Sequence, residues 1–208
     1  MPDSSDRAGA RPCELVLVLG GARSGKSTAA ERMARDGGRV LFIATAEALD
    51  EAMERRIAAH RRYRPEAWDT LEEPIHLSRA VRPLVRRYDT FVLDCLTLWV
   101  SNLLLEDGEA SGAEKMILET VGRLLDLIDA AGGRWILVSN EVGQGIVPAS
   151  PLARDYRDVL GRVNQLVASR ADRAYLMVAG MALELKALGG SPAPRPARTE
   201  AGRRGGLR

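Results

Sequence analysis

The chain has 208 residues, of which 46% are hydrophobic and 28% charged, and this predicts one domain with a buried core. A formal net charge of +2 and an aromatic fraction of 4% argue against a nucleic-acid-binding surface. The apolar runs are far shorter than the roughly 20 residues that span a bilayer, and we expect neither a membrane span nor a signal peptide. The two cysteines, Cys13 and Cys95, lack metal-ligand spacing, so we expect a reduced, cytoplasmic protein without a disulfide.

The ends of the chain differ in composition from its middle. Residues 1–12 are polar and irregular, and residues 189–208 are rich in Pro, Gly and Arg with almost no large apolar side chain. Such segments bury too little surface to offset the entropy lost on ordering. We therefore expect a disordered N-terminus, a single folded domain over residues 13–188 and a disordered basic tail over residues 189–208.

Between these ends, short apolar runs alternate with helical patterns. Strands are predicted at residues 14–20, 39–45, 68–73, 90–96 and 134–141, and a closing pair at 173–180 and 181–188 suggests a hairpin that turns at Gly180. Helices are predicted at residues 26–37, 47–60, 77–88, 96–105, 113–133 and 151–170. This order predicts an α/β fold whose mostly parallel sheet carries helices on both faces and ends in an antiparallel strand or hairpin.

In such sheets ligands bind beyond the carboxyl ends of the strands. Polar residues follow five of the predicted strands there: the segment Gly20 to Ser27, Thr45, Glu72, Asp94, and Asn140 with Glu141. The sequence therefore predicts that a glycine-rich loop, several carboxylates, a hydroxyl and an amide meet at one edge.

The segment GGARSGKS matches the phosphate-binding pattern G-x-x-x-x-G-K-[ST] and lies between a predicted strand and a predicted helix. Glycines let backbone N–H groups converge on phosphate oxygens, and the helix N-terminus adds a positive field. We expect Lys26 to reach the β- and γ-phosphates as a catalytic residue and Ser27 to bind Mg²⁺. The predicted nucleotide contacts in this loop are Gly20, Gly21, Ala22, Arg23, Ser24, Gly25, Lys26 and Ser27.

Other polar residues at this edge allow two interpretations each. Asp94, at the end of an apolar strand, suits a magnesium ligand but also a helix N-cap. Glu72 or Glu73 suits a ribose hydroxyl or base edge, or is a solvated carboxylate. The segment SNEVGQGIVP, residues 139–148, has the composition of a substrate loop, and the pair Asn164 and Gln165 faces either the site or solvent.

His60 is the harder case. It falls on the apolar stripe of the predicted helix 47–60, where a histidine is more often a core or cap residue than a catalyst. Arg61, Arg62 and Arg64 follow it, however, and neighbouring cations favour a neutral imidazole. A neutral imidazole is a nucleophile, and the arginines suit phosphates beside it. His76, the other histidine, is predicted to lie on the surface.

These segments together resemble one family. GGARSGKS, IAT, RIAAHRRYRP, EEP, LDCLTLWVSNLL, NEVGQGIVP and GRVNQ occur in the order found in the bifunctional adenosylcobinamide kinase/adenosylcobinamide-phosphate guanylyltransferases of cobalamin synthesis. The resemblance covers about residues 15–186, and the combination of R-I-x-x-H-R with N-E-V-G-x-G-I-V-P makes it specific. It implies a RecA-like P-loop core and a homotrimer.

The resemblance also implies two reactions and their residues. A nucleoside triphosphate, GTP or ATP, phosphorylates the aminopropanol hydroxyl of adenosylcobinamide, and GTP then passes GMP to adenosylcobinamide phosphate through a guanylyl-histidine at His60. The implied nucleotide contacts outside the P-loop are Ala44, Thr45, Ala46, Arg61, Arg62, Tyr63, Arg64, Glu72 and Asp94. Many relatives have glutamate where this chain has Asp94, which still suits Mg²⁺, and some have a hydroxyl where it has Ala46.

Two alternatives remain. An ordinary P-loop small-molecule kinase would use the same loop with a structural His60. A nucleotide-dependent switch would bind the nucleotide without turning over adenosylcobinamide.

Overall fold

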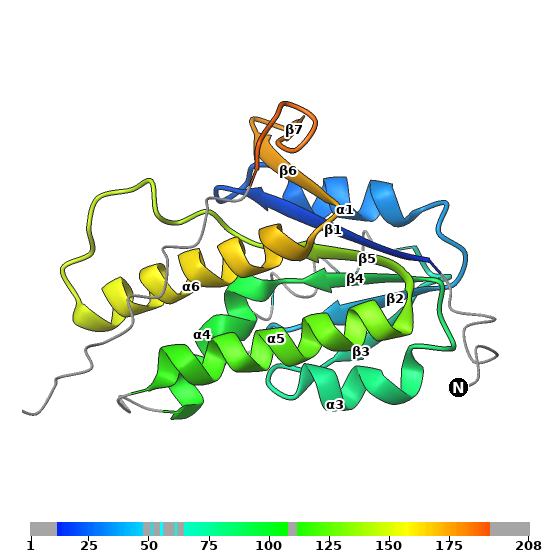
Figure 1. Ribbon diagram of the computed structural model, residues 1–208, viewed down its shortest axis with the longest axis horizontal. Helices are drawn as coiled ribbons and strands as arrows, with labels where there is room; N and C mark the ends of the chain where they lie inside the picture. Colours follow the sequence, from blue (N-terminus) through cyan, green and yellow to red (C-terminus); the bar gives the residue numbers. More distant parts are fainter. Residues whose placement is uncertain are drawn as a thin grey trace, which may run out of the picture.

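A seven-stranded sheet forms the centre of the computed structural model, which describes residues 12–47, 51, 55, 61, 65–107 and 112–191 (Figure 1). The strand order is β3-β2-β4-β5-β1-β6-β7, and every pairing is parallel except that of β6 with β7. The strands are β1 (Cys13–Gly20), β2 (Val40–Ala44), β3 (Asp69–Glu72), β4 (Thr90–Asp94), β5 (Gly133–Val138), β6 (Arg173–Val178) and β7 (Met181–Glu184). The predicted fold class, a mostly parallel sheet with helices and a C-terminal antiparallel hairpin, is confirmed, and β5 lies between β1 and β4.

Helices cover both faces of the sheet, but unequally. The helices are α1 (Lys26–Ala34), α3 (Leu77–Val81), α4 (Leu96–Asp107), α5 (Ala113–Ala131) and α6 (Pro151–Arg170). Figure 1 shows α1 on one face, whereas α3, α4, α5 and α6 gather on the other. The described helices therefore bury one face of the sheet under several elements and the other under α1.

Successive side chains of the strands alternate between two hydrophobic clusters, one on each face of the sheet. In β1, Leu15 and Leu17 face the cluster that includes Trp99 of α4 and Leu125 of α5, and all four side chains are almost completely buried. The intervening Val16 and Val18 face the smaller cluster, which contains Ala30 and Ala34 of α1. Because successive side chains of a strand point to opposite faces, one apolar run serves both layers.

The helix predicted at residues 77–88 is shorter than expected. The α-helix α3 ends at Val81, and a 3-10 turn, η2 (Arg82–Leu84), follows it. Pro83 explains the difference, because proline has no N–H to donate to the preceding turn and its ring disfavours helical geometry before it. The prediction of one continuous helix here was wrong.

The predicted C-terminal hairpin is confirmed. β6 and β7 pair antiparallel, with Val178 opposite Met181, so Ala179 and Gly180 form the turn. Both turn residues have positive φ, 51° and 81°, which is the requirement of a type I′ turn. A turn of this type matches the twist of the strands that it joins.

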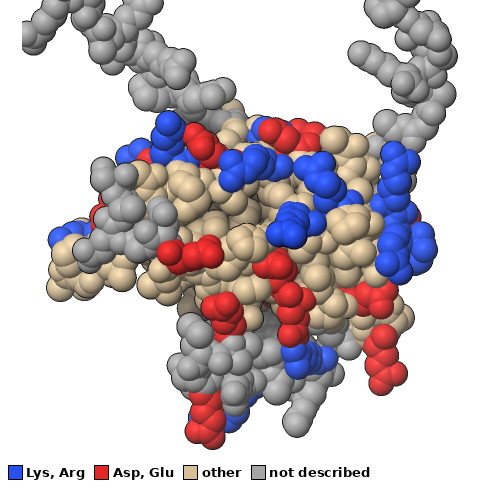
Figure 2. All heavy atoms as spheres, turned by 90° about the horizontal axis from the view of Figure 1, so that it is seen from below, with Lys and Arg blue, Asp and Glu red and all other residues tan. Residues whose placement is uncertain are grey.

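The cysteines, the helix lengths and the surface charges add further observations. Cys13 and Cys95 are free thiols, and no helix among the described residues is long and apolar enough to cross a membrane. Figure 2 shows acidic and basic side chains interspersed on the face that it presents. The predicted helix 47–60 and the predicted disordered segments fall largely outside the described residues.

Candidate active site

Six parallel strands, β1 to β6, have their carboxyl ends at one edge of the sheet. In the register, Ala44 at the end of β2 lies opposite both Glu72 of β3 and Asp94 of β4, and Asp94 lies opposite Val138 of β5. β1 ends at Gly20, where the glycine-rich loop begins. The prediction that the polar strand ends gather at one edge is therefore confirmed.

Backbone geometry shapes the loop of residues 20–27 for phosphate. Gly20, Arg23 and Gly25 have positive φ values of 153°, 56° and 95°. A Cβ on Gly20 would lie 2.5 Å from the carbonyl oxygen of Met177, so only glycine fits there. Gly25 is the N-cap of α1 and supplies no side-chain hydrogen bond, which leaves the first amides of the helix open to an anion.

Two side chains of this loop are almost fully buried. Lys26 is 8% exposed, and its ammonium donates a hydrogen bond of 2.6 Å to the carbonyl oxygen of Gly21, so the cation lies across the loop. The hydroxyl of Ser24 is buried without a hydrogen-bond partner among the described residues. A buried unsatisfied hydroxyl costs on the order of 1–3 kcal/mol, a cost that functional sites often carry.

The turn of the β6–β7 hairpin contacts the backbone of the P-loop. The backbone N–H of Gly180, in the hairpin turn, donates to the carbonyl oxygen of Ser24 at 3.0 Å. A Cβ on Gly25 would lie 3.4 Å from the Cα of Gly180, so the two backbones are in close contact. Sequence reasoning missed this contact, because hairpin and loop are more than 150 residues apart in the chain.

Asp94 ends β4 half-buried, and no hydrogen bond to its carboxylate is found among the described residues. The backbone carbonyl of Cys95, rather than the Asp94 side chain, accepts from Trp99 in the first turn of α4. This favours the ligand interpretation of Asp94 over the N-cap interpretation. Burial and the charge of Asp94 raise the pKa of the Cys95 thiol to about 11, so the thiol stays protonated at neutral pH.

Thr45 does not offer its hydroxyl to the edge as predicted. The side chain is 0% exposed, and its hydroxyl donates to the carbonyl oxygen of Cys95 at 2.7 Å while accepting from the Cys95 N–H at 2.9 Å. Asn102 of α4 donates to the Thr45 carbonyl oxygen at 2.9 Å. Thr45 thus joins the ends of β2 and β4, and its buried hydroxyl pairs with the backbone of Cys95 rather than standing free at the edge.

The residues at the edge fit a magnesium ion that is bound together with a nucleotide. Ser27, the second residue of α1, is half-buried, and Asp94 carries the carboxylate described above. Among residues 12–47, 65–107 and 112–191, no three His, Cys, Asp or Glu side chains form a protein-only metal site. Mg²⁺ usually takes one or two protein ligands and completes its shell with phosphates and water, so Ser27 and Asp94 suffice.

The structure distinguishes Glu72 from Glu73. Glu72 forms an exposed ion pair with Arg61, so two predicted nucleotide contacts meet at the end of β3. Glu73 accepts from the backbone N–H groups of Ile75 and His76 at 2.9 and 2.7 Å, which fixes the approach to α3. Glu72 is therefore the candidate ligand and Glu73 a structural residue.

Not every predicted residue can be placed. Ala44 and Ala46 lie half-buried at and just beyond the end of β2, and Ala22 and Arg23 are exposed at the tip of the P-loop. His76 is exposed, as predicted. Four predicted residues lie outside the described part of the chain: His60, Arg62, Tyr63 and Arg64.

A network of hydrogen bonds between largely buried polar groups lies at the carboxyl end of β5. Ser139 is 0% exposed and donates to Asn164 at 2.7 Å, and Asn164 donates to the carbonyl oxygen of Asn140 at 3.0 Å. The backbone N–H of Asn140 donates to the hydroxyl of Thr97 at 2.7 Å. Asn164 therefore faces the strand end, whereas Gln165 is exposed. Thr97 was missed, although its hydroxyl within the apolar segment LTLWV was a usable signal.

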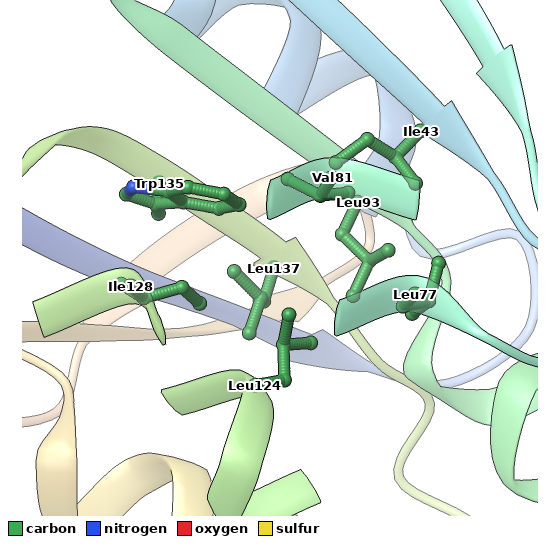
Figure 3. Close-up of a pocket in the computed structure, with 8 residues that line it drawn as sticks. All are labelled: Ile43, Leu77, Val81, Leu93, Leu124, Ile128, Trp135 and Leu137. Carbon is green, nitrogen blue, oxygen red and sulfur yellow. The ribbon is translucent and has the colours of Figure 1, made fainter. Parts of the chain in front are cut away.

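An apolar space inside the larger core lies away from this edge. Figure 3 shows apolar side chains of β2, β4, β5, α3 and α5 facing one another in the larger core, without room for a water molecule. Its lining residues are Ile43, Leu77, Val81, Leu93, Leu124, Ile128, Trp135 and Leu137. This space is packed interior rather than a ligand site.

Comparisons with known proteins agree with the geometry. Residues 16–185 match the family described as cobinamide kinase / cobinamide phosphate guanyltransferase. A "Bifunctional adenosylcobalamin biosynthesis protein CobP" of Pseudomonas aeruginosa is 47% identical over 82% of this chain and 96% of its own. The CobU proteins of Escherichia coli and Salmonella typhimurium, which carry the same description, are each 39% identical over 83% of this chain and 99% of their own. A KaiC-like protein of Pyrococcus horikoshii is 16% identical, with a TM-score of 0.47 over 80% of this chain and 72% of its own.

Proposed function

The chain belongs to the cobinamide kinase / cobinamide phosphate guanyltransferase family, and we propose that it is an enzyme that performs both of these reactions in turn. In the first, the aminopropanol hydroxyl of adenosylcobinamide takes the γ-phosphate of GTP or ATP. In the second, adenosylcobinamide phosphate takes GMP from GTP, which gives adenosylcobinamide-GDP and pyrophosphate.

The P-loop supports the phosphorylation step. The arm hydroxyl attacks the γ-phosphorus, the bond to the bridging oxygen breaks, and the nucleoside diphosphate leaves. Phosphoryl transfer needs positioning and neutralisation of charge more than covalent help from the protein. The open amides of α1 and the ammonium of Lys26, which already lies across the loop, are suited to both tasks.

Ser27 and Asp94 would hold the magnesium ion at this edge. A bound Mg²⁺ would neutralise negative charge that develops on the phosphates. Asp94 suits this role directly or through a water molecule, because its carboxylate lies at the end of β4 without a hydrogen-bonded partner in the described chain.

His60 is our candidate for the covalent step. Its imidazole nitrogen attacks the α-phosphorus of GTP and releases pyrophosphate, and a phosphate oxygen of adenosylcobinamide phosphate then displaces the histidine. Dividing one displacement into two is the usual gain of nucleophilic catalysis. What supports the location is Arg61, the next residue in the sequence, whose side chain pairs with Glu72 at the same sheet edge.

The convergence of the P-loop, Asp94 and the Arg61–Glu72 pair at one edge carries the proposal. A kinase with a structural His60 would need the loop and Asp94 but not a basic segment beside Glu72. A nucleotide-dependent switch would need no acceptor. Assembly into a homotrimer is a further expectation that follows from the family.

A two-step assay tests the proposal. The purified protein is incubated with adenosylcobinamide, GTP and Mg²⁺, and the corrinoid products are separated by chromatography. We expect adenosylcobinamide phosphate first and adenosylcobinamide-GDP afterwards. Phosphate alone would support the monofunctional kinase, and an unchanged corrinoid at high enzyme concentration would support the switch.

A further inference from the structure

The loop between β5 and α6 exposes apolar side chains at the nucleotide edge. Ile146 is 98% exposed and Val147 60%, and Leu152, in the first turn of α6, is 44% exposed. We call these three residues the β5–α6 apolar patch. In Figure 1 this loop extends outward beyond the carboxyl ends of the strands before α6 begins.

Specific hydrogen bonds hold the loop at both ends. At its start, the Glu141 N–H donates to the Gly20 carbonyl oxygen at 3.1 Å, and the Glu141 carboxylate accepts from the Gly143 N–H at 2.7 Å. At its end, the guanidinium of Arg154 donates to the carbonyl oxygens of Pro148 and Ala149 at 3.0 and 2.7 Å. The protein therefore presents the patch from an anchored loop.

The anchoring also fixes how far the patch lies from the phosphate site. Glu141 is hydrogen-bonded to the first residue of the P-loop, and Ile146 is five residues further on. A chain of five residues spans at most about 17 Å, so Ile146 lies within that distance of Glu141. A substrate that contacts both Ile146 and the P-loop therefore has to span no more than roughly this distance.

We propose that the β5–α6 apolar patch binds the corrin macrocycle of adenosylcobinamide, while the aminopropanol arm reaches the P-loop. This inference rests on the proposed function. The macrocycle is too wide to follow its arm into the loop, and its faces carry methyl groups that apolar side chains can cover. Its rim carries carboxamides, and Gln144, exposed within the same loop, offers an amide to pair with them.

One docking surface would serve both reactions. Phosphorylation and guanylyl transfer change only the end of the arm and leave the macrocycle as it was. A corrinoid that stays on the patch keeps the acceptor close to the nucleotide through both steps, which raises its effective concentration. A second copy of the chain is the other possible occupant, but three side chains are few compared with the roughly 800 Å² that each partner buries in a stable interface.

Equilibrium dialysis tests the proposal, because corrinoids absorb visible light. Adenosylcobinamide is dialysed against the full-length wild type, an Ile146→Ser/Val147→Ser double variant, Ile146→Leu and Leu188→Ser. Leu188 is 72% exposed and lies after the edge strand β7, outside the β5–α6 loop, which makes it the matched control. We expect about ten-fold or weaker binding for the double variant and unchanged binding for the other two.

Two further measurements separate the outcomes. Labelling with α-labelled GTP in the absence of corrinoid should be unchanged in the double variant, because the patch does not contact the nucleotide. Equal corrinoid binding by the wild type and the double variant overturns the inference. A loss of corrinoid binding together with a smaller sedimentation coefficient also overturns it, because the patch would then contact a second copy of the chain. If the wild type binds adenosylcobinamide but forms neither product, the proposed function fails while dialysis still decides the inference.

Discussion

The two ends of the active-site edge are built in different ways. At the β1–α1 end, backbone contacts with Met177 and Gly180 hold the P-loop, and Lys26 and Ser24 are buried. At the β3 end, the exposed side chains of Arg61 and Glu72 hold each other. Backbone contacts and buried side chains keep the phosphate-binding loop in one conformation. The exposed Arg61–Glu72 ion pair, in contrast, costs little free energy to break. The comparison suggests that the phosphate end is fixed and the β3 end adjusts during the reaction.

Removing the ammonium at the fixed end should have the largest effect. For Lys26→Ala we expect kcat of the phosphorylation step to fall by about 10²–10³-fold, the usual loss when one preorganised donor to the transition state is removed. Steady-state kinetics with adenosylcobinamide measure this, and the thermal midpoint confirms folding. Lys115→Ala, an exposed lysine of α5, is the control and should be silent. Unchanged turnover in Lys26→Ala would contradict the phosphate assignment.

A pair of neighbouring glycines tests the backbone of the fixed end. Gly20→Ala should lower the free energy of unfolding by about 1–3 kcal/mol, because its Cβ meets the Met177 carbonyl oxygen at 2.5 Å. A Cβ added at Gly21 meets nothing within 4 Å, so Gly21→Ala should change the free energy of unfolding by less than about 0.5 kcal/mol. Urea denaturation measures both. Equal values for the two variants would mean that the hairpin does not support the loop.

Two neighbouring glutamates test the β3 end, where we expect smaller effects. Glu73→Ala removes the acceptor of two backbone N–H groups and should destabilise the fold by about 1 kcal/mol with little change in GTP affinity. Glu72→Ala should do the reverse, weakening GTP binding while stability barely changes, since exposed ion pairs contribute about 0.2–1 kcal/mol. Urea denaturation measures the stability of both variants, and calorimetric titration measures their GTP affinity. If Glu72→Ala destabilised the fold and Glu73→Ala weakened GTP binding, Glu73 would be the nucleotide ligand and Glu72 the structural residue.

The sequence was sufficient to predict the fold class and the sheet edge at which the polar strand ends meet. Short apolar runs, glycines after helices and the P-loop pattern are local signals. They predicted the succession of strands and helices along the chain from β1 to the closing hairpin. The edge could be predicted as well, because parallel strands bring their carboxyl ends together whatever their order in the sheet.

Side-chain roles within the edge depended on contacts that are distant in sequence. Thr45 was predicted to face the ligand, but its hydroxyl pairs with Cys95 because β2 and β4 are neighbours, which the chain order does not state. Glu72 and Glu73 are adjacent and chemically equal, and only the path of the chain toward α3 separates them. The Gly180–Ser24 contact likewise follows from the position of β6 beside β1.

The covalent role of His60 is the central claim, and one labelling experiment tests it most directly. The wild type and His60→Ala are incubated with GTP labelled at the α-phosphate, denatured, and treated with acid or base. The account predicts label on the wild type that survives base and is lost in acid, as a phosphoramidate should, and no label on His60→Ala. An unlabelled wild type, or a fully labelled His60→Ala, would contradict it.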